Sequence, residues 1–307
     1  MAGLLVLPLA LLALVAGVVV AVLRRQSLVV PPEAHDEVAR THRRLVLLRL
    51  GALVAAAVTG VAVTSGAGGG LGGPGQVASA GPALAALVFL AGCCLAELTV
   101  RRAATRVRTA SLAPRSVLEV LPRAHARTAA VALGAVAATL ALGTALGDAD
   151  DLGRAGRSLA TRCVDASGLE VSHLRGPWPG SFYALPVAAA LTLAALLAAV
   201  TLVVVARRPV VSQDRALDAA MRRWSARDVL LGLTLASCVT LVPVLVLMTA
   251  GLAGASCRPT GYGALALLCG ALALAACFGT AWAASSLLVR PALVAMPTAQ
   301  PREVAGR

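Results

Sequence analysis

In the stretch "VVVAVLRRQSLVV" (residues 18–30), an apolar run stops abruptly at two arginines. The same change occurs at "LTVRRAAT" (98–105) and at "VVVARRPVV" (203–211). Short loops rich in arginine and lysine stay on the cytoplasmic side of a membrane. Each arginine pair is therefore predicted to mark the cytoplasmic end of a membrane-spanning helix.

The chain as a whole is strongly apolar, with 59% hydrophobic and 13% charged residues. A soluble domain has about half apolar and about a quarter charged residues. A stretch of about 20 uncharged residues can cross a ~30 Å hydrocarbon layer as a helix. Seven stretches meet this length: 4–23, 45–64, 83–100, 128–147, 184–206, 229–250 and 264–289. We predict an all-α fold, a seven-span transmembrane bundle over residues 1–290, with a disordered cytoplasmic tail at 291–307.

The distribution of arginine predicts the orientation of this bundle. All 27 basic residues are arginine, because the chain contains no lysine. Of these, 21 lie in segments 24–44, 101–127, 207–228 and 290–307, and 5 lie in segments 65–82, 148–183 and 251–263. The bias alternates at every loop, so we predict a multi-pass plasma-membrane protein with its amino terminus outside and its carboxyl terminus in the cytoplasm. A cleaved signal peptide carries positive charge before its apolar stretch. The arginines come after stretch 4–23, which favours a retained span.

The net charge of +13 also bears on partners. The arginines are spread over several loops without interleaved aromatic residues, which argues against nucleic acid. Anchoring at anionic inner-leaflet lipids explains them better, since each basic residue near that surface contributes about 1 kcal/mol. The loops 24–44, 101–127 and 207–228 are the expected contact regions for the lipid bilayer. They are also the candidates for binding a cytoplasmic protein partner.

Parts of these loops have helical patterns. In segment 212–228, Ser212 is a candidate N-cap, and Leu217, Met221 and Trp224 fall on one helical face. Segments 31–44 and 113–127 have similar patterns. The favoured interpretation is interfacial helices on the inner leaflet, and the alternative is a set of docking surfaces for a protein.

Two charged residues, Arg49 and Glu97, lie inside predicted spans. Ionisable groups in the hydrocarbon layer are functional candidates by default. Both lie near the predicted inner surface, so they could form an ion pair if spans 45–64 and 83–100 are neighbours. The alternative is that each side chain reaches the surface by snorkelling, with Glu97 also contacting Arg101 one turn on. The sequence favours snorkelling and leaves the pair open.

Five of the seven cysteines fall within spans, where packing is the expected role. Cys163 and Cys257 are the two that fall outside, both in segments predicted to face the exterior. An oxidising compartment favours a disulfide between two such thiols. We therefore predict a Cys163–Cys257 bond. The aromatic residues of the same outer loop, Trp178, Phe182 and Tyr183, are expected to anchor it at the interface.

Several activities lack the residues that they need. Retinal proteins require a lysine in a span, and all four histidines lie in loops, where they cannot hold a transmembrane haem. Neither a phosphate-binding GxxxxGK[ST] motif nor an HExxH motif is present. We therefore predict no catalytic residues, no metal and no cofactor.

The stretch "CCLAELTVRRAATRVRTASLAPRS" (93–116) resembles uncharacterised multi-span integral membrane proteins of actinobacteria. The resemblance implies a polytopic membrane protein and transfers no catalytic residue. With the features above, it favours a non-enzymatic scaffold, sensor or accessory subunit that acts through its inner loops. The alternative is a permease or transport component that works with a separate ATPase.

Overall fold

Six long apolar helices form the body of the molecule. A computed structural model of the chain describes residues 27–30, 35–66, 75–100, 116–164, 168–212, 214–255, 259–289 and 292–295. Six of the described helices are long and apolar enough to cross a membrane: α2 (His35–Thr64), α4 (Gly81–Leu98), α6 (Arg123–Ala145), α7 (Ser181–Arg207), α8 (Arg215–Ala253) and α9 (Tyr262–Leu288). The mostly helical class is thereby confirmed. The helices match the second to seventh predicted stretches, whereas the first, 4–23, lies outside the described residues.

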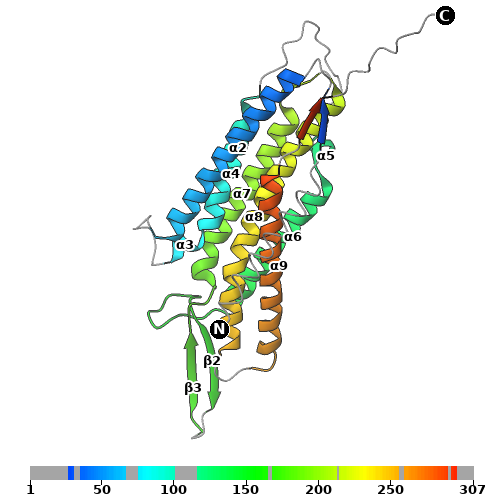
Figure 1. Ribbon diagram of the computed structural model, residues 1–307. Coiled ribbons are helices and arrows are strands. Elements are labelled where there is room, and N and C mark those ends of the chain that lie inside the picture. Colours follow the sequence, from blue (N-terminus) through cyan, green and yellow to red (C-terminus); the bar gives the residue numbers. More distant parts are fainter. Residues whose placement is uncertain are drawn as a thin grey trace, which may run out of the picture.

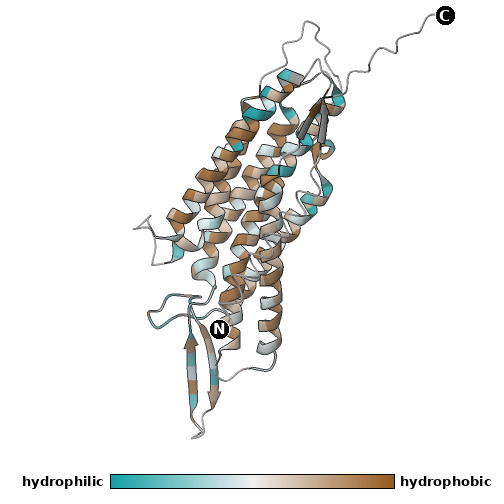
Figure 2. Cartoon of the chain, viewed as in Figure 1, coloured by the Kyte–Doolittle hydropathy of each residue, from teal (hydrophilic) through white to brown (hydrophobic). Residues whose placement is uncertain are grey.

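The helices lie side by side in one elongated bundle (Figure 1). Helix α8 lies at its centre and contacts α4, α6, α7 and α9, while α2 packs mainly on α4. In the most apolar part of α8, 67% of the residues are buried, against 17% in α2. Figure 2 shows apolar residues along the length of the bundle and hydrophilic residues gathered towards its ends, as a membrane-spanning bundle requires.

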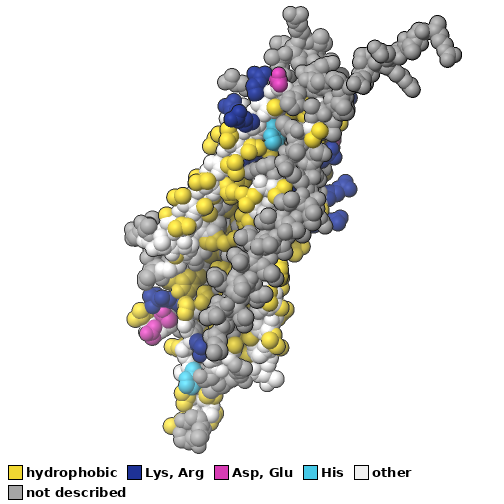
Figure 3. Space-filling view, in the orientation of Figure 1, with side chains coloured by type: hydrophobic (Ala, Val, Ile, Leu, Met, Phe, Trp, Pro, Cys, Tyr) yellow, Lys and Arg dark blue, Asp and Glu magenta, His cyan; other side chains and the backbone are white. Residues whose placement is uncertain are grey.

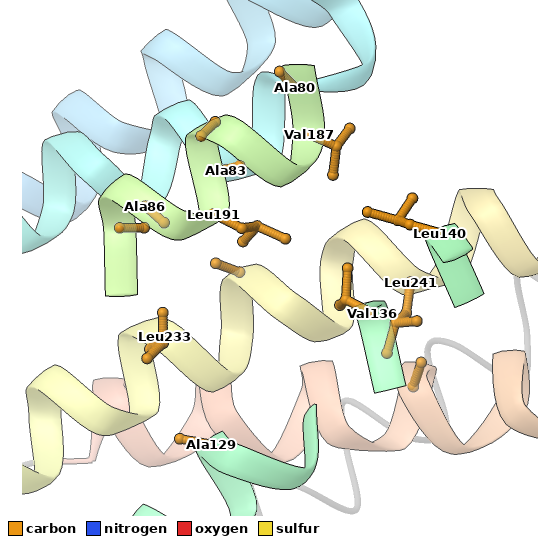
Figure 4. Close-up of a cluster of buried hydrophobic side chains, with 14 of the residues drawn as sticks. Ala80, Ala83, Ala86, Ala129, Val136, Leu140, Val187, Leu191, Leu233 and Leu241 are labelled. Atoms are coloured by element: carbon orange, nitrogen blue, oxygen red, sulfur yellow. The ribbon is translucent and has the colours of Figure 1, made fainter. Parts of the chain in front are cut away.

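Small side chains allow the helices to pack closely. The main buried cluster is rich in alanine and draws on α4, α6, α7, α8 and α9. Figure 4 shows Leu191 of α7 and Leu233 of α8 pointing into the space between their helices, with Val136 of α6 nearby. Without a hydrophobic driving force in lipid, such close van der Waals packing is what holds membrane helices together.

Two short β-pairs distinguish the two ends of the bundle. At one end, where α2, α6 and α8 begin, β1 (Ser27–Val30) pairs in parallel with β4 (Ala292–Ala295). We call this the basic end. At the opposite end, β2 (Leu159–Val164) and β3 (Glu170–Arg175) form an antiparallel pair that projects beyond the helices (Figure 1). We call this the hairpin end.

Neither pair follows from the sequence patterns. Strand β4 lies within the tail predicted to be disordered, so that prediction is wrong for Ala292–Ala295, which are held by backbone pairing with β1. The rest of the tail lies outside the described residues. Two short helices complete the described elements: α3 (Gln76–Ser79) at the hairpin end and α5 (Val117–Val120) at the basic end.

Helix α8 is longer than the span predicted within it. Its 39 residues extend about 58 Å at 1.5 Å per residue, well beyond a ~30 Å hydrocarbon layer. The segment predicted as a separate interfacial helix is therefore the first part of α8. Its cap is Asp214, which accepts hydrogen bonds from the backbone N–H groups of Ala216 and Leu217, and not Ser212. The predicted apolar face is confirmed, because Leu217, Met221 and Trp224 are all buried.

Candidate functional site: a buried ion network at the basic end

Arg49 lies at the centre of a buried ion network between α2, α4, α7 and α8. Its Nη2 forms an ion pair with Glu97 and donates a hydrogen bond to Ser225 Oγ at 2.7 Å. Its Nη1 lies 3.0 Å from Asp228 Oδ2. The side chain of Arg49 is only 1% exposed. One guanidinium group therefore links α2 to carboxylates on both α4 and α8.

Glu97 extends the network to the end of α7. Its second carboxylate oxygen, Oε2, lies 3.0 Å from Nη1 of Arg208, the residue that follows the last turn of that helix. Both side chains are at most 1% exposed. Two arginines thus face two carboxylates, Glu97 and Asp228, and the formal charges of the four groups cancel.

An aromatic pair covers the same region. The Arg49 guanidinium carbon lies 4.5 Å from the centre of the Trp224 ring, a cation–π distance. His42, two turns before Arg49 on α2, stacks on Trp224 with ring centres 4.9 Å apart. Trp224, on the buried face of α8, therefore packs against the same side of α2 that carries Arg49.

A second ion pair holds the end of α7 against α8. Arg222 Nε lies 2.7 Å from Asp218 Oδ2. Arg222 also donates to the carbonyl oxygens of Val205, Ala206 and Arg208 at 2.8 to 2.9 Å. The last carbonyls of a helix lack partners within it and carry partial negative charge, so an arginine is well suited to bind them. Arg222 thereby fixes the backbone from which Arg208 reaches Glu97.

The arrangement is suited to holding helices together. Taking charges out of water costs several kcal/mol for each ion, and this cost is recovered only with good pairing and additional hydrogen bonds. Here each arginine of the network contacts at least one carboxylate, and each carboxylate contacts an arginine on another helix or one turn away. The network links four helices at one level of the bundle. Within the described part of the chain, no three His, Cys, Asp or Glu side chains gather as a metal site.

The structure brings Arg49 and Glu97 together, as the ion-pair hypothesis requires, whereas the favoured interpretation had both side chains snorkelling. Burial explains the difference, since neither side chain has access to the membrane surface. The sequence analysis missed Asp228 and Arg208. Each lies at the edge of a predicted span, where a charge is usually solvated. One available signal was that Asp228 continues the helical face of Met221 and Trp224.

Six of the seven cysteines lie in the described residues. The five in the spans form no disulfide: Cys93, Cys94, Cys238, Cys269 and Cys277. Cys163 lies in β2, but Cys257 lies outside the described residues. The Cys163–Cys257 bond therefore stays a prediction. Trp178 is fully buried in the bundle, so the expectation that it anchors the loop at the membrane interface is wrong.

Comparison of the chain with protein-family models, with curated proteins and with solved structures finds no match. The resemblance to actinobacterial membrane proteins therefore stays an expectation.

Proposed function

We propose that the protein is a non-enzymatic integral membrane protein that acts as a scaffold or accessory subunit through its basic end. The proposal places it in the plasma membrane with the basic end in the cytoplasm. It includes a seventh span at residues 4–23 and a Cys163–Cys257 disulfide on the outer side. The binding surface is formed by the exposed arginines of the inner loops, and its partners are anionic lipid headgroups and an acidic protein surface.

The observation that carries the proposal is the convergence of exposed arginines at one end. Among the described residues there, the exposed arginines are Arg40, Arg43, Arg44, Arg123, Arg127, Arg207, Arg215 and Arg223. The exposed acids described at this end are Asp36, Glu119 and Asp214. Figure 3 shows arginine side chains gathered near this end of the visible face. Such a one-sided charge raises the association rate and the affinity for anionic partners.

The position of the buried charges supports a scaffold over a transport component. A coupled carrier requires ionisable groups along its path through the membrane. In the six described spans, the charged side chains lie towards the basic end and none lies in the remaining length towards the hairpin end. The buried ions are paired with one another between helices, so their role is to stabilise the basic end.

The test is capture of partners from native membranes with the full chain as bait. The variant Arg40→Gln/Arg43→Gln/Arg44→Gln removes three exposed charges of one inner loop, and we expect it to recover at least tenfold less of the main captured protein. The matched control replaces the same three residues by lysine, which keeps the charge and should keep the capture. Capture by the unchanged chain should also fall as salt rises, because salt screens exposed charges.

Equal recovery with the glutamine and lysine variants would contradict the proposal, because the arginines of this loop would then contribute no binding energy. Labelling of introduced cysteines in intact cells tests the orientation. Position 36, which is exposed at the basic end, should be protected in intact cells, and position 165 should react with a membrane-impermeant reagent. The reverse pattern would exclude a cytoplasmic basic end.

A further inference from the structure

An apolar groove runs along the bundle between α2 and α8, with α4 as its floor. Its volume is about 410 Å³. Its lining comes from α2, α4, α8 and the last turn of α9, and it extends from Leu53 and Leu287 to Thr64 and Pro82. Leu53 to Thr64 corresponds to about 17 Å along α2. The groove therefore covers roughly half the thickness of a ~30 Å hydrocarbon layer and ends near the hairpin end.

The walls of the groove are made of small residues. Seven of its lining residues are glycine or alanine: Ala56, Ala57, Gly60, Ala85, Ala86, Gly232 and Ala236. Small residues at a membrane interface let the backbones of two helices approach closely, which is the main source of their association in lipid. A surface of this kind fits a helix.

The chain itself supplies a segment that starts beside this groove. Strand β1 is anchored over the gap between α2 and α8, because Val30 is fully buried in a cluster with Val38 and Leu45 of α2 and Met221 of α8. The apolar stretch 4–23 ends four residues before β1 begins, which is at most about 14 Å of extended chain. Chain length alone therefore keeps residue 23 within about 14 Å of the start of β1, beside the gap between these two helices.

The sequence of that stretch complements the groove. Its 20 residues could extend about 30 Å as a helix, enough to reach past the whole groove. The part level with the groove, roughly residues 4–15, is rich in leucine, and Leu4, Leu7, Leu11 and Leu14 would lie on one face. Large side chains on this face would fill a groove whose walls are glycine and alanine. Arg24 and Arg25 would remain at the basic end, beside the other arginines.

We propose that residues 4–23 dock as a helix in the apolar groove lined by α2, α4, α8 and α9, with the leucine-rich residues 4–15 level with the groove. The segment runs antiparallel to α2, from β1 at the basic end towards the hairpin end. The inference concerns the assembly of the bundle and is independent of the function proposed for the arginines.

Photo-crosslinking of the full chain in its native membrane tests the proposal. Val61 lines the groove and is 67% exposed, so p-benzoylphenylalanine can replace it without opening the core. With residue 23 level with Leu45, an antiparallel helix brings about residue 7 level with Val61, which lies 16 residues beyond Leu45 along α2. Mass spectrometry should therefore find the crosslinks of the Val61 probe within roughly residues 4–10. Moving the probe to Leu53, two turns nearer the basic end, should shift the crosslinks to roughly residues 12–18.

The matched control places the same probe at Leu193 of α7, which is 56% exposed and does not line the groove. It should give lipid adducts and no crosslink to residues 4–23. Three results would overturn the proposal. These are lipid adducts alone at Val61 and Leu53, crosslinks that join two chains and double the mass on a gel, or equal labelling of 4–23 from Leu193.

Discussion

The two ends of the bundle are held together by different physical interactions. At the basic end, buried arginines and carboxylates join α2, α4, α7 and α8. At the hairpin end, Trp178 is fully buried and donates from Nε1 to the Gly143 carbonyl oxygen at 2.7 Å. A Cβ atom at position 251 would lie 2.9 Å from that ring, so the glycine allows α8 to pack closely against Trp178. One end relies on paired charges and the other on close packing around one ring.

Each end should therefore be sensitive to a different kind of substitution. Removing one member of a buried ion pair leaves the other charge in a poorly solvated site, which costs far more than the pair contributes. Close packing responds instead to volume, because a cavity or an overlap is felt even at the scale of one methylene group. Charge substitutions should therefore damage the basic end most, and volume substitutions the hairpin end.

The largest effect is expected for Glu97→Gln. The substitution keeps the shape of the side chain but leaves Arg49 and Arg208 without the carboxylate that both contact. Breaking a buried pair in this way costs about 3–5 kcal/mol. The measurement is thermal unfolding in detergent, with Glu119→Gln, an exposed glutamate at the same end, as the control. An equal shift in both variants would mean that the network is not a stabilising contact.

The next effect is expected from reducing the predicted Cys163–Cys257 bond. Mass spectrometry of thiol-blocked, unreduced protein should recover one peptide linked through both cysteines. Reduction should then lower the stability by about 2–4 kcal/mol, the range typical of disulfides. Recovery of both cysteines as alkylated thiols would exclude the bond.

A smaller effect is expected for Trp178→Phe at the hairpin end. The change removes the N–H that donates to Gly143 and part of the buried ring. A buried carbonyl oxygen left without its donor costs about 1–3 kcal/mol. Val164→Ala, at a position 64% exposed on β2, is the control and should leave the unfolding temperature unchanged. If both variants behave alike, Trp178 does not anchor the hairpin end.

The smallest effect concerns pH at the hairpin end. Partial desolvation raises the pKa of Asp150, but hydrogen bonds from the Arg154 backbone and side chain outweigh this and hold the pKa below its usual value. Ionised Asp150 therefore stabilises the fold at pH values above its unfolded pKa, and this contribution is lost as pH falls through the folded pKa. Hydrogen exchange at Leu152 and Arg154 should rise in acid, after correction for the intrinsic rate. Asp150→Asn should abolish this pH dependence.

The helical part of the fold could be predicted because span length is fixed by membrane thickness, and the apolar stretches reach that length without charges. The hairpin could not, because β3 is mostly exposed, β2 is buried only at Leu159 and Thr161, and neither strand has a clear alternation of apolar residues in its sequence. The pairing of β1 with β4 joins opposite ends of the chain, and no local pattern encodes such a contact.

The candidate site could be predicted only in part. Arg49 and Glu97 stood out because a charge inside an apolar stretch is rare. Arg207 and Arg208 look equivalent in the sequence, yet Arg207 is exposed and Arg208 is buried against Glu97. Which member of the pair turns inward depends on where α7 ends and on the contact of Arg222 with its last carbonyls. These are tertiary contacts, and the sequence pattern does not specify them.

The buried charges at the basic end are expected to act as one unit. A double-mutant cycle on Arg49→Gln and Glu97→Gln, followed by thermal unfolding in detergent, measures their coupling. Because the two side chains share an ion pair, the double variant should lose at least about 1 kcal/mol less stability than the sum of the single variants. Strict additivity of the two losses would mean that Arg49 and Glu97 act independently and that the buried charges form no such unit.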